Sequence, residues 1–372
     1  MGGVRVLHVN THMNIGGIGQ YIVSLAKALK QKRVECFVAS SGGELESELV
    51  KLDVRHMRLD MNTKFEFGPK VFRSASRLTR IIRDNKIDLI HAHTRVSQVA
   101  SFLASRRTGI PYIATCHGYF NAKLSRRLFD TWGEKVVAIS DAVRGHLEKD
   151  FNVDPRRVEV IYNGIDLKRF SNIFSTDQIA RAKRSLGIQR GDVIGTMGRL
   201  SSVKGQKFLV EAMKEIVSKS KDTWCLIIGS GHEEAALMDL SRSLGLEDRI
   251  IFTGAAYMDI PLYLACMDIF VLPSIEEGLG LSLLEAMSLG RPCIASATGG
   301  IKDIVNDQVN GILTPVGDSR AIASAVLKIL NDKVLAKNMS DGAKDFVRGK
   351  FSIEAMADNM IDLYGRVIRA KS

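Results

Sequence analysis

Two acidic residues, Glu277 and Glu285, enclose a short glycine loop in the second half of the chain. The loop follows an apolar run that ends at Pro273, and it precedes an apolar helical pattern. A strand, a glycine loop and a helix in this order leave free backbone N–H groups at the helix N-terminus, where phosphates and polyols bind. The two carboxylates can accept hydrogen bonds from sugar hydroxyls. The pattern therefore indicates chemistry that a nucleotide sugar requires.

A structural interpretation competes with this one. Residues Ser282-Leu283-Leu284-Glu285 have the spacing of a capping box, in which Glu285 bonds back to the backbone N–H of Ser282. Glu277 also fits a solvent-exposed loop acid. The acid spacing alone favours structure over function, and only the surrounding motifs reverse that order.

Several further motifs follow one another along the chain. They are Thr115-Cys116-His117-Gly118, Tyr162-Asn163-Gly164-Ile165-Asp166, Gly198-Arg199-Leu200 with Lys204-Gly205, Glu277 to Met287, Gly290-Arg291-Pro292, Gly299-Gly300 and Asn310-Gly311. Together they resemble the family 4 retaining glycosyltransferases with their E-x7-E motif, including enzymes that build bacterial lipopolysaccharide and cell envelope. The resemblance implies an α/β protein of the GT-B fold, with two Rossmann-like domains whose mainly parallel sheets face across a cleft. It also implies transfer of a hexose from a nucleoside-diphosphate sugar, such as a UDP-sugar, to a hydroxyl acceptor.

The hydrophobic pattern indicates the same class of fold. Short β-rich runs alternate with helical stretches, which is typical of a parallel sheet covered by helices. The expected strands are Val4–Asn10, Val34–Ser40, Leu89–Ala92, Tyr112–Cys116, Val136–Ile139 and Val158–Tyr162, then Val193–Met197, Trp224–Ile228, Ile250–Phe252, Ile269–Leu272, Cys293–Ser296 and Gly311–Leu313. We expect an acceptor-binding domain over residues 1–166 and a donor-binding domain over 167–352. By the resemblance, a final helix within 353–372 crosses back to the first domain.

Two basic residues and one histidine follow predicted strands. Arg199 and Lys204 come after Val193–Met197, where fixed cations can neutralise the charge that grows on a leaving nucleoside diphosphate. Such side chains would replace a metal, and we expect neither a metal nor another cofactor. His117 matches the family histidine that lies against the donor sugar, so we assign it transition-state support or a contact with a sugar hydroxyl, and not nucleophilic attack. His91 and His93 also end a predicted strand, and they fit packing or hydrogen-bonding groups.

The glycine loops complete the expected donor site. By the resemblance, Glu277 holds hydroxyls of the donor sugar with the N–H groups of Gly278, Leu279, Gly280 and Leu281, while Glu285 binds the ribose. Gly16 and Gly17 follow the first predicted strand, and the matching family loop faces the donor phosphate and the acceptor. A plain tight turn remains the alternative for that loop. It is not a G-x-G-x-x-G sequence, so a dinucleotide cofactor is disfavoured.

Charge is distributed unevenly over the 372 residues. Residues 1–165 hold 26 Lys and Arg against 16 Asp and Glu, whereas the remainder holds 26 against 25. Basic residues with apolar neighbours recur at Arg73, Arg77, Arg80 and Arg83, and at Lys123, Arg126 and Arg127. A solvated helix face explains either stretch alone, but the bias of the whole half favours docking on an anionic membrane or a phosphorylated glycolipid. Few aromatic residues and no reader motif argue against nucleic acid.

Three other observations restrict the setting. The chain has no run of 18 apolar residues and no signal-peptide pattern at its start, and its five cysteines lack C-x-x-C spacing. We therefore expect a cytoplasmic protein, peripheral on the inner face of the membrane if docking occurs. Two rival functions remain: a nucleotide-sugar epimerase on the same fold, and a nonenzymatic nucleotide-sugar-binding subunit.

Overall fold

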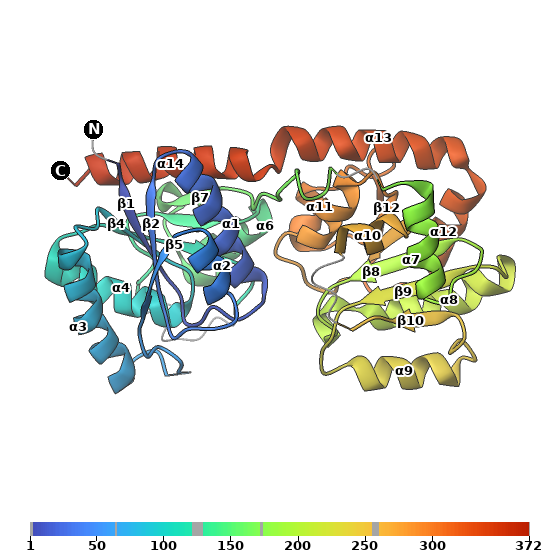
Figure 1. The fold of residues 1–372 in the computed structure, drawn as a ribbon, viewed down its shortest axis with the longest axis horizontal. Helices are drawn as coiled ribbons and strands as arrows, with labels where there is room; N and C mark the ends of the chain where they lie inside the picture. Colours follow the sequence, from blue (N-terminus) through green and yellow to red (C-terminus); the bar gives the residue numbers. More distant parts are fainter. Residues whose placement is uncertain (1–2, 64, 121–128, 172–173, 255–259, 372) are drawn as a thin grey trace. The chain divides into compact units, whose positions relative to one another are not determined.

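The computed structural model describes residues 3–63, 65–120, 129–171, 174–254 and 260–371. The chain divides into two compact units (Figure 1). Unit 1 comprises Met1–Gly164 together with Ile353–Ser372, and unit 2 comprises Ile165–Ser352. The division after Gly164 lies two residues before the boundary we expected from the sequence.

Unit 1 is built on a seven-stranded sheet whose pairings are all parallel. The strands are β1 (Arg5–Val9), β2 (Glu35–Ser40), β3 (Arg55–Arg58), β4 (Leu89–Ala92), β5 (Tyr112–Cys116), β6 (Val136–Ala138) and β7 (Val158–Val160). Their order in the sheet is β3-β2-β1-β4-β5-β6-β7, so the direction of winding reverses between β1 and β4. Ligands of open α/β sheets bind beyond the carboxyl ends of the strands at such a point.

Helices cover both faces of this sheet. They are α1 (Gly17–Gln31), α2 (Glu46–Lys51), α3 (Pro69–Asp84), α4 (Arg95–Thr108), α6 (Asp141–Phe151) and α14 (Ile353–Arg369), with the 3-10 turn η1 (Pro155–Arg157). Successive strand residues point to opposite faces, and in β1 Val6 packs into the core beside α1 while Leu7 packs into the core beside α3 and α4. Both faces of the central strands β1, β4 and β5 are therefore buried, which explains why these three strands read as continuous apolar runs.

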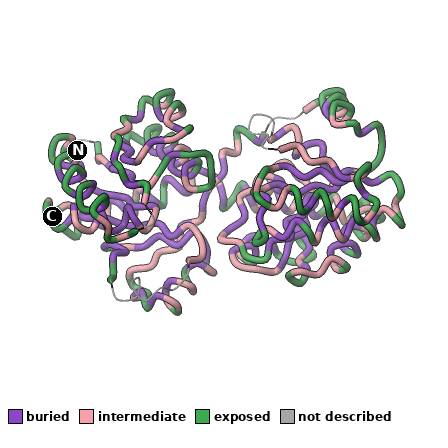
Figure 2. The backbone as a smooth tube through the Cα atoms, turned by 90° about the horizontal axis from the view of Figure 1, so that it is seen from below, coloured by how far each residue is buried: buried purple, intermediate pink, exposed green. Residues whose placement is uncertain are grey.

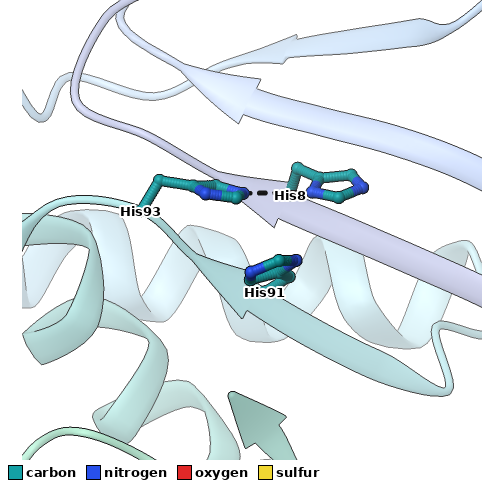
Figure 3. Close-up of side chains that lie close together, drawn as sticks. All are labelled: His8, His91 and His93. Atoms are coloured by element: carbon teal, nitrogen blue, oxygen red, sulfur yellow. Dashed lines mark hydrogen bonds between the residues drawn. The ribbon is translucent and has the colours of Figure 1, made fainter. Parts of the chain in front are cut away.

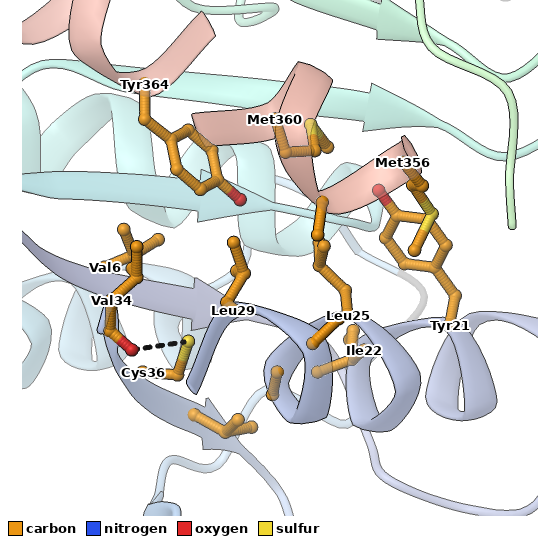
Figure 4. Close-up of a cluster of buried hydrophobic side chains, with 14 of the residues drawn as sticks. Val6, Tyr21, Ile22, Leu25, Leu29, Val34, Cys36, Met356, Met360 and Tyr364 are labelled. Carbon is orange, nitrogen blue, oxygen red and sulfur yellow. Dashed lines mark hydrogen bonds between the residues drawn. The ribbon is translucent and has the colours of Figure 1, made fainter. Parts of the chain in front are cut away.

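The C-terminal helix α14 is part of the core of unit 1. Met356, Met360 and Tyr364 pack against Leu25 and Leu29 of α1 (Figure 4). Tyr364 is 1% exposed, and a buried tyrosine needs a partner for its hydroxyl. That partner is Nδ1 of His91 at the end of β4, 2.8 Å away.

Unit 2 repeats the same plan with six parallel strands. They are β8 (Val193–Met197), β9 (Trp224–Ile228), β10 (Ile250–Phe252), β11 (Ile269–Leu272), β12 (Cys293–Ser296) and β13 (Ile312–Thr314), in the order β10-β9-β8-β11-β12-β13. The helices are α7 (Thr176–Ser185), α8 (Gln206–Lys219), α9 (Glu234–Ser243), α10 (Ile260–Ala265), α11 (Leu281–Ser288), α12 (Ser319–Asn331) and α13 (Lys333–Lys350), with the 3-10 turns η2 (Ser202–Lys204) and η3 (Gly299–Asp303). The winding reverses between β8 and β11, so the loops after these two strands form the expected binding edge.

Burial follows this layered plan in each unit (Figure 2). Strands β4, β5, β8, β11 and β12 are buried along their whole length. All five cysteines are buried and free, as reduced core residues are. Within the described ranges, no helix is long and apolar enough to cross a membrane.

Candidate active site

The loops after β8 and β11 interlock at the binding edge of unit 2. The backbone N–H of Ile275 donates to the carbonyl of Val203 over 2.9 Å. Gly205 has a φ of +63°, and a Cβ on it would lie 2.2 Å from the carbonyl oxygen of Pro273. Glycine is therefore required there, because any side chain would push the two loops apart. The close contact brings the basic loop after β8 against the acidic loop after β11.

An ion pair forms where these loops meet. Nζ of Lys204 lies 2.5 Å from Oε2 of Glu277, and the two side chains are 24% and 12% exposed. The hydroxyl of Ser274 also donates to this oxygen over 3.4 Å. Lys204, which we expected at the diphosphate, and Glu277, which we expected at the sugar, are thus held together although they lie 73 positions apart in the sequence. The lysine ammonium has three donors and one goes to Glu277, so the others can still reach a ligand.

Arg199 is the second cation expected at this edge. Its side chain is exposed, and among the residues the structure describes it makes no ion pair and no hydrogen bond. Its backbone carbonyl, in contrast, accepts a hydrogen bond from the Gln206 side chain over 3.0 Å. The loop is therefore fixed while the guanidinium is free to bind an anion.

The glycine loop turns into α11 without a capping side chain. Gly280 is the N-cap with a φ of +107°, and the helix begins at Leu281. Ser282 therefore lies inside the helix, and the capping box that competed with the functional interpretation does not form. The loop is also pressed against η3: a Cβ on Gly300 would lie 2.2 Å from the carbonyl oxygen of Gly278. The helix start thus presents backbone N–H groups that no side chain caps, in a conformation set by glycine.

Glu285 lies half-buried in the second turn of α11. Burial raises the pKa of its carboxyl to about 7, although the positive charge of Arg169 acts in the opposite direction. Across the described ranges, its carboxyl has no hydrogen bond and no ion pair within 4 Å. An acid that loses hydration without gaining a partner costs stability, so donors such as ribose hydroxyls would compensate for that loss.

Two of the expected residues lie at the carboxyl end of the sheet of unit 1. Gly16 and Gly17 precede and begin α1, and a Cβ on either would meet nothing within 4 Å. A Cβ on Gly19, by contrast, would lie 2.7 Å from the Asn14 carbonyl oxygen. Packing therefore requires glycine at Gly19, while Gly16 and Gly17 leave open space where a ligand can approach the backbone.

His117 follows β5 and is linked to His93, which we expected to be a packing or hydrogen-bonding group, and through it to His8. Its Nε2 lies 3.2 Å from Nδ1 of His93, and Nε2 of His93 lies 3.1 Å from Nδ1 of His8 (Figure 3). Burial lowers the pKa of His117 and of His8 to about 3. The signal available in the sequence was the H-x-H pattern at the end of β4, but its partners depend on the order of the strands.

His8, His91 and His93 place ring nitrogens within 4.8 Å of one another, a spacing that also suits a metal ion. Both nitrogens of His91 already have partners, Tyr364 at 2.8 Å and the Thr115 hydroxyl at 2.6 Å. His93 likewise uses both of its nitrogens. Only Nε2 of His8 lacks a partner among the described residues. The arrangement therefore suits a hydrogen-bonded network better than a cation.

The predicted basic surface is described in part. Arg73, Arg77 and Arg80 are exposed along α3, with Phe72 beside them 45% exposed. Lys123, Arg126 and Arg127 lie outside the described residues. The sequence interpretation missed three exposed aromatic residues, Phe65, Phe67 and Phe129, of which Phe67 and Phe129 contact each other at 5.1 Å between ring centroids. The sequence did carry a signal for this exposed aromatic surface, since all three phenylalanines lie in or near polar loops.

Comparison with known proteins identifies the family. Residues 15–169 match the model of Glycosyltransferase Family 4, and residues 178–346 match that of Glycosyl transferases group 1. An Escherichia coli UDP-Gal:alpha-D-GlcNAc-diphosphoundecaprenol alpha-1,3-galactosyltransferase is 29% identical over 79% of each chain.

Two solved structures share the fold over nearly the whole chain. A glycosyltransferase from Rickettsia africae superposes with a TM-score of 0.89 at 25% identity, over 99% of both chains. Anabaena HepE in complex with UDP-glucose superposes with a TM-score of 0.86 at 22% identity, over 97% of this chain and 99% of its own. The protein is therefore a member of the family 4 glycosyltransferases and has the GT-B fold.

Proposed function

We propose that the protein moves a hexose from a nucleoside-diphosphate sugar to a hydroxyl of a glycolipid or saccharide acceptor, with retained anomeric configuration. The observation that carries the proposal is the Lys204–Glu277 pair at the loop before α11. Arg199 lies on the same loop as Lys204 and Glu285 lies in α11, and among the described residues neither side chain has a hydrogen bond or an ion pair. These groups match the charges of a diphosphate and the hydroxyls of a sugar and a ribose. In this proposal unit 2 binds the donor and unit 1 binds the acceptor.

Each group has one role in the proposed reaction. Arg199 grips diphosphate oxygens with its planar fork, and Lys204 supplies a point charge shared with Glu277. Glu277 orients hydroxyls of the donor sugar, the N–H groups from Gly278 to Leu281 bind oxygens of the ligand, and Glu285 accepts hydrogen bonds from the ribose. In unit 1, Gly16 and Gly17 leave open space beside the backbone, where the acceptor can approach.

The proposed chemistry breaks the bond between the anomeric carbon and the diphosphate oxygen. The acceptor hydroxyl attacks the same face of the resulting oxocarbenium-like ion and loses its proton to the leaving phosphate. Arg199 and Lys204 stabilise the charge that develops on the diphosphate, the kind of contribution that preorganised electrostatic groups make. In this proposal they take the part that a metal ion has in other transferases.

The comparisons favour a UDP-sugar donor and a lipid-linked acceptor. Anabaena HepE is solved with UDP-glucose, and the E. coli relative takes its name from a diphosphoundecaprenol-linked sugar. Exposed cations and aromatic residues on unit 1 suit an anionic membrane, where basic side chains meet lipid phosphates and aromatic rings meet the interface. Lys70, Arg73 and Arg77 also line a pocket of about 120 Å³ with Asp60 and Ser74. We therefore propose a role in bacterial envelope assembly, such as lipopolysaccharide biosynthesis, at the inner face of the membrane.

The test is a donor and acceptor panel with the purified protein. UDP-, GDP- and ADP-sugars are each incubated with diphospholipid-linked and free saccharides, and the anomeric configuration of the product is read by NMR. Transfer with retention in EDTA is expected. An inverted product, or loss of turnover in EDTA, contradicts the mechanism. Nucleotide release without an acceptor indicates an epimerase, and donor binding without turnover indicates a binding subunit.

A further inference from the structure

Three imidazole rings form a line across the carboxyl ends of neighbouring strands in unit 1. His8 comes from β1, His93 follows β4 and His117 follows β5, and these strands are adjacent in the sheet. Nδ1 of His8 faces Nε2 of His93 at 3.1 Å, and Nδ1 of His93 faces Nε2 of His117 at 3.2 Å. Figure 3 shows the first of these two links. His93 thus uses both ring nitrogens to connect the other two rings.

The protons in this line have only two possible arrangements. Burial lowers the pKa of all three imidazoles well below the usual value, so each ring is neutral at neutral pH and carries one proton. A neutral imidazole donates with one nitrogen and accepts with the other. The line therefore runs either from His8 through His93 to His117, or in the reverse direction.

The far end of the line distinguishes the two directions. Nε2 of His8 is buried and has no partner among the described residues. If His117 were the first donor, this nitrogen would carry a proton and would be a buried N–H without an acceptor. If His8 is the first donor, its Nε2 carries no proton and leaves only a lone pair unused. Orphaned buried N–H groups are the rarer of the two, so the line starts at His8 and ends on Nε2 of His117.

We propose that His93, itself oriented by His8, is a positioning residue that fixes the proton of His117 on Nδ1. No described residue bonds to that nitrogen, and the ring is half-buried, with Tyr21 packed edge-on at 4.8 Å between centroids. His117 therefore meets its ligand as a hydrogen-bond donor. Under the proposed function, on which this step rests, the ligand atom is an oxygen of a saccharide substrate. A nitrogen that carries a proton cannot act as the base or the nucleophile.

Imidazole tautomers are read directly by two-bond 1H–15N correlation spectra of protein labelled with 15N-histidine. The protein is used whole and without ligand, and spectra of His117→Gln identify the signals of His117. We expect Nδ1 of His117 to carry the proton. In His93→Leu nothing fixes the proton, so both tautomers of His117 should be populated and should interconvert. In His93→Asn the side-chain amide lies near the former position of Nδ1, and it should restore the Nδ1–H form.

Activity should follow the tautomer. We expect kcat to fall about 10- to 100-fold in His93→Leu, by analogy with the loss of a hydrogen-bond partner that orients a metal-binding histidine. KM should change less, and His93→Asn should recover activity. His232→Gln, at an exposed site in unit 2, is the matched control and should change neither reading.

The outcomes separate this inference from the proposed function. A proton on Nε2 of His117 in the wild-type protein overturns the inference whatever the activity. So does an unchanged tautomer in folded His93→Leu. If that variant does not fold, the wild-type spectrum decides alone. A proton on Nδ1 in a protein that transfers no sugar leaves the network in place and removes the proposed function.

Discussion

Replacing Arg199 and Lys204 separately by alanine should slow transfer by similar factors while affecting stability differently. Both cations are assigned to the leaving diphosphate, and loss of one preorganised stabiliser typically lowers kcat by about 10²-fold or more. A factor of 10² corresponds to about 2.7 kcal/mol of transition-state stabilisation. Arg199 is exposed and has no ion pair among the described residues, so its removal should leave the melting temperature unchanged.

Lys204 should behave otherwise because it neutralises Glu277, which is only 12% exposed. Removal of the lysine leaves that carboxylate poorly hydrated and without its cation. Removing one partner of a fully buried ion pair lowers the free energy of unfolding by roughly 3–5 kcal/mol. Because this pair is partly exposed, we expect a loss of about 1–2 kcal/mol. For a unit of this size the melting temperature should fall by roughly 2–8 °C.

The assay combines kcat/KM with thermal unfolding of each variant. Lys219→Ala is the matched control, because Lys219 pairs with Glu215 in the same unit at an exposed site, where a pair is worth about 0.5 kcal/mol or less. Near-normal kcat/KM in both Arg199→Ala and Lys204→Ala would refute the leaving-group assignment. An unchanged melting temperature in Lys204→Ala would show that the ion pair is not stabilising.

Three other predictions concern the acids and the basic surface. Glu277→Gln should abolish transfer while the fold persists, because an amide is a weaker acceptor than a carboxylate; circular dichroism and kcat test this, and appreciable transfer contradicts it. The folded-state pKa of Glu285, about 7, lies above the usual value, so the charged carboxyl costs stability increasingly from about pH 4.5 and fully above pH 7. Glu285→Gln should therefore raise the free energy of unfolding at pH 8 by at most about 3 kcal/mol, and with it the melting temperature, but it should raise neither at pH 4. An equal gain at both pH values would refute this. The protein should bind anionic vesicles through unit 1 in a salt-dependent way. Charge reversal at Arg73, Arg77 and Arg80 should lower the vesicle affinity measured by co-sedimentation roughly 10²-fold, since each basic residue contributes about 1 kcal/mol of binding free energy. Equal binding to neutral vesicles would count against docking.

The strands were predictable because most of them are buried on both faces. A run such as Ile269–Leu272 can lie only in a core, and the observed β11 has these bounds. The strand that sequence reasoning missed is β3, Arg-His-Met-Arg, at the edge of its sheet. An edge strand needs little apolar surface, so its position depends on pairing with β2 rather than on its own pattern.

The chemistry of the site was only partly predictable. The motifs placed Lys204 and Glu277 on loops at the same edge, because loops after neighbouring parallel strands meet there. That the two side chains pair depends on close loop contacts at Gly205, which residue types alone do not reveal. Whether Glu285 caps a helix or meets a ligand depended on where α11 begins, a matter of one or two residues. Helix ends are the least certain part of any interpretation from sequence.

The place of α14 in unit 1 has a consequence for how the protein is made. Unit 2 is one continuous stretch of chain, whereas the core of unit 1 includes Met356, Met360 and Tyr364 from after that stretch. During synthesis, the ribosome therefore delivers every residue of unit 2 before unit 1 has its last core helix. Until Ile353–Arg369 has emerged, the apolar face of α1 lacks its cover and Nδ1 of His91 lacks its hydroxyl partner. The first unit to be translated is thus the second that can finish folding, and a nascent chain stopped near Ser352 should be a substrate for chaperones.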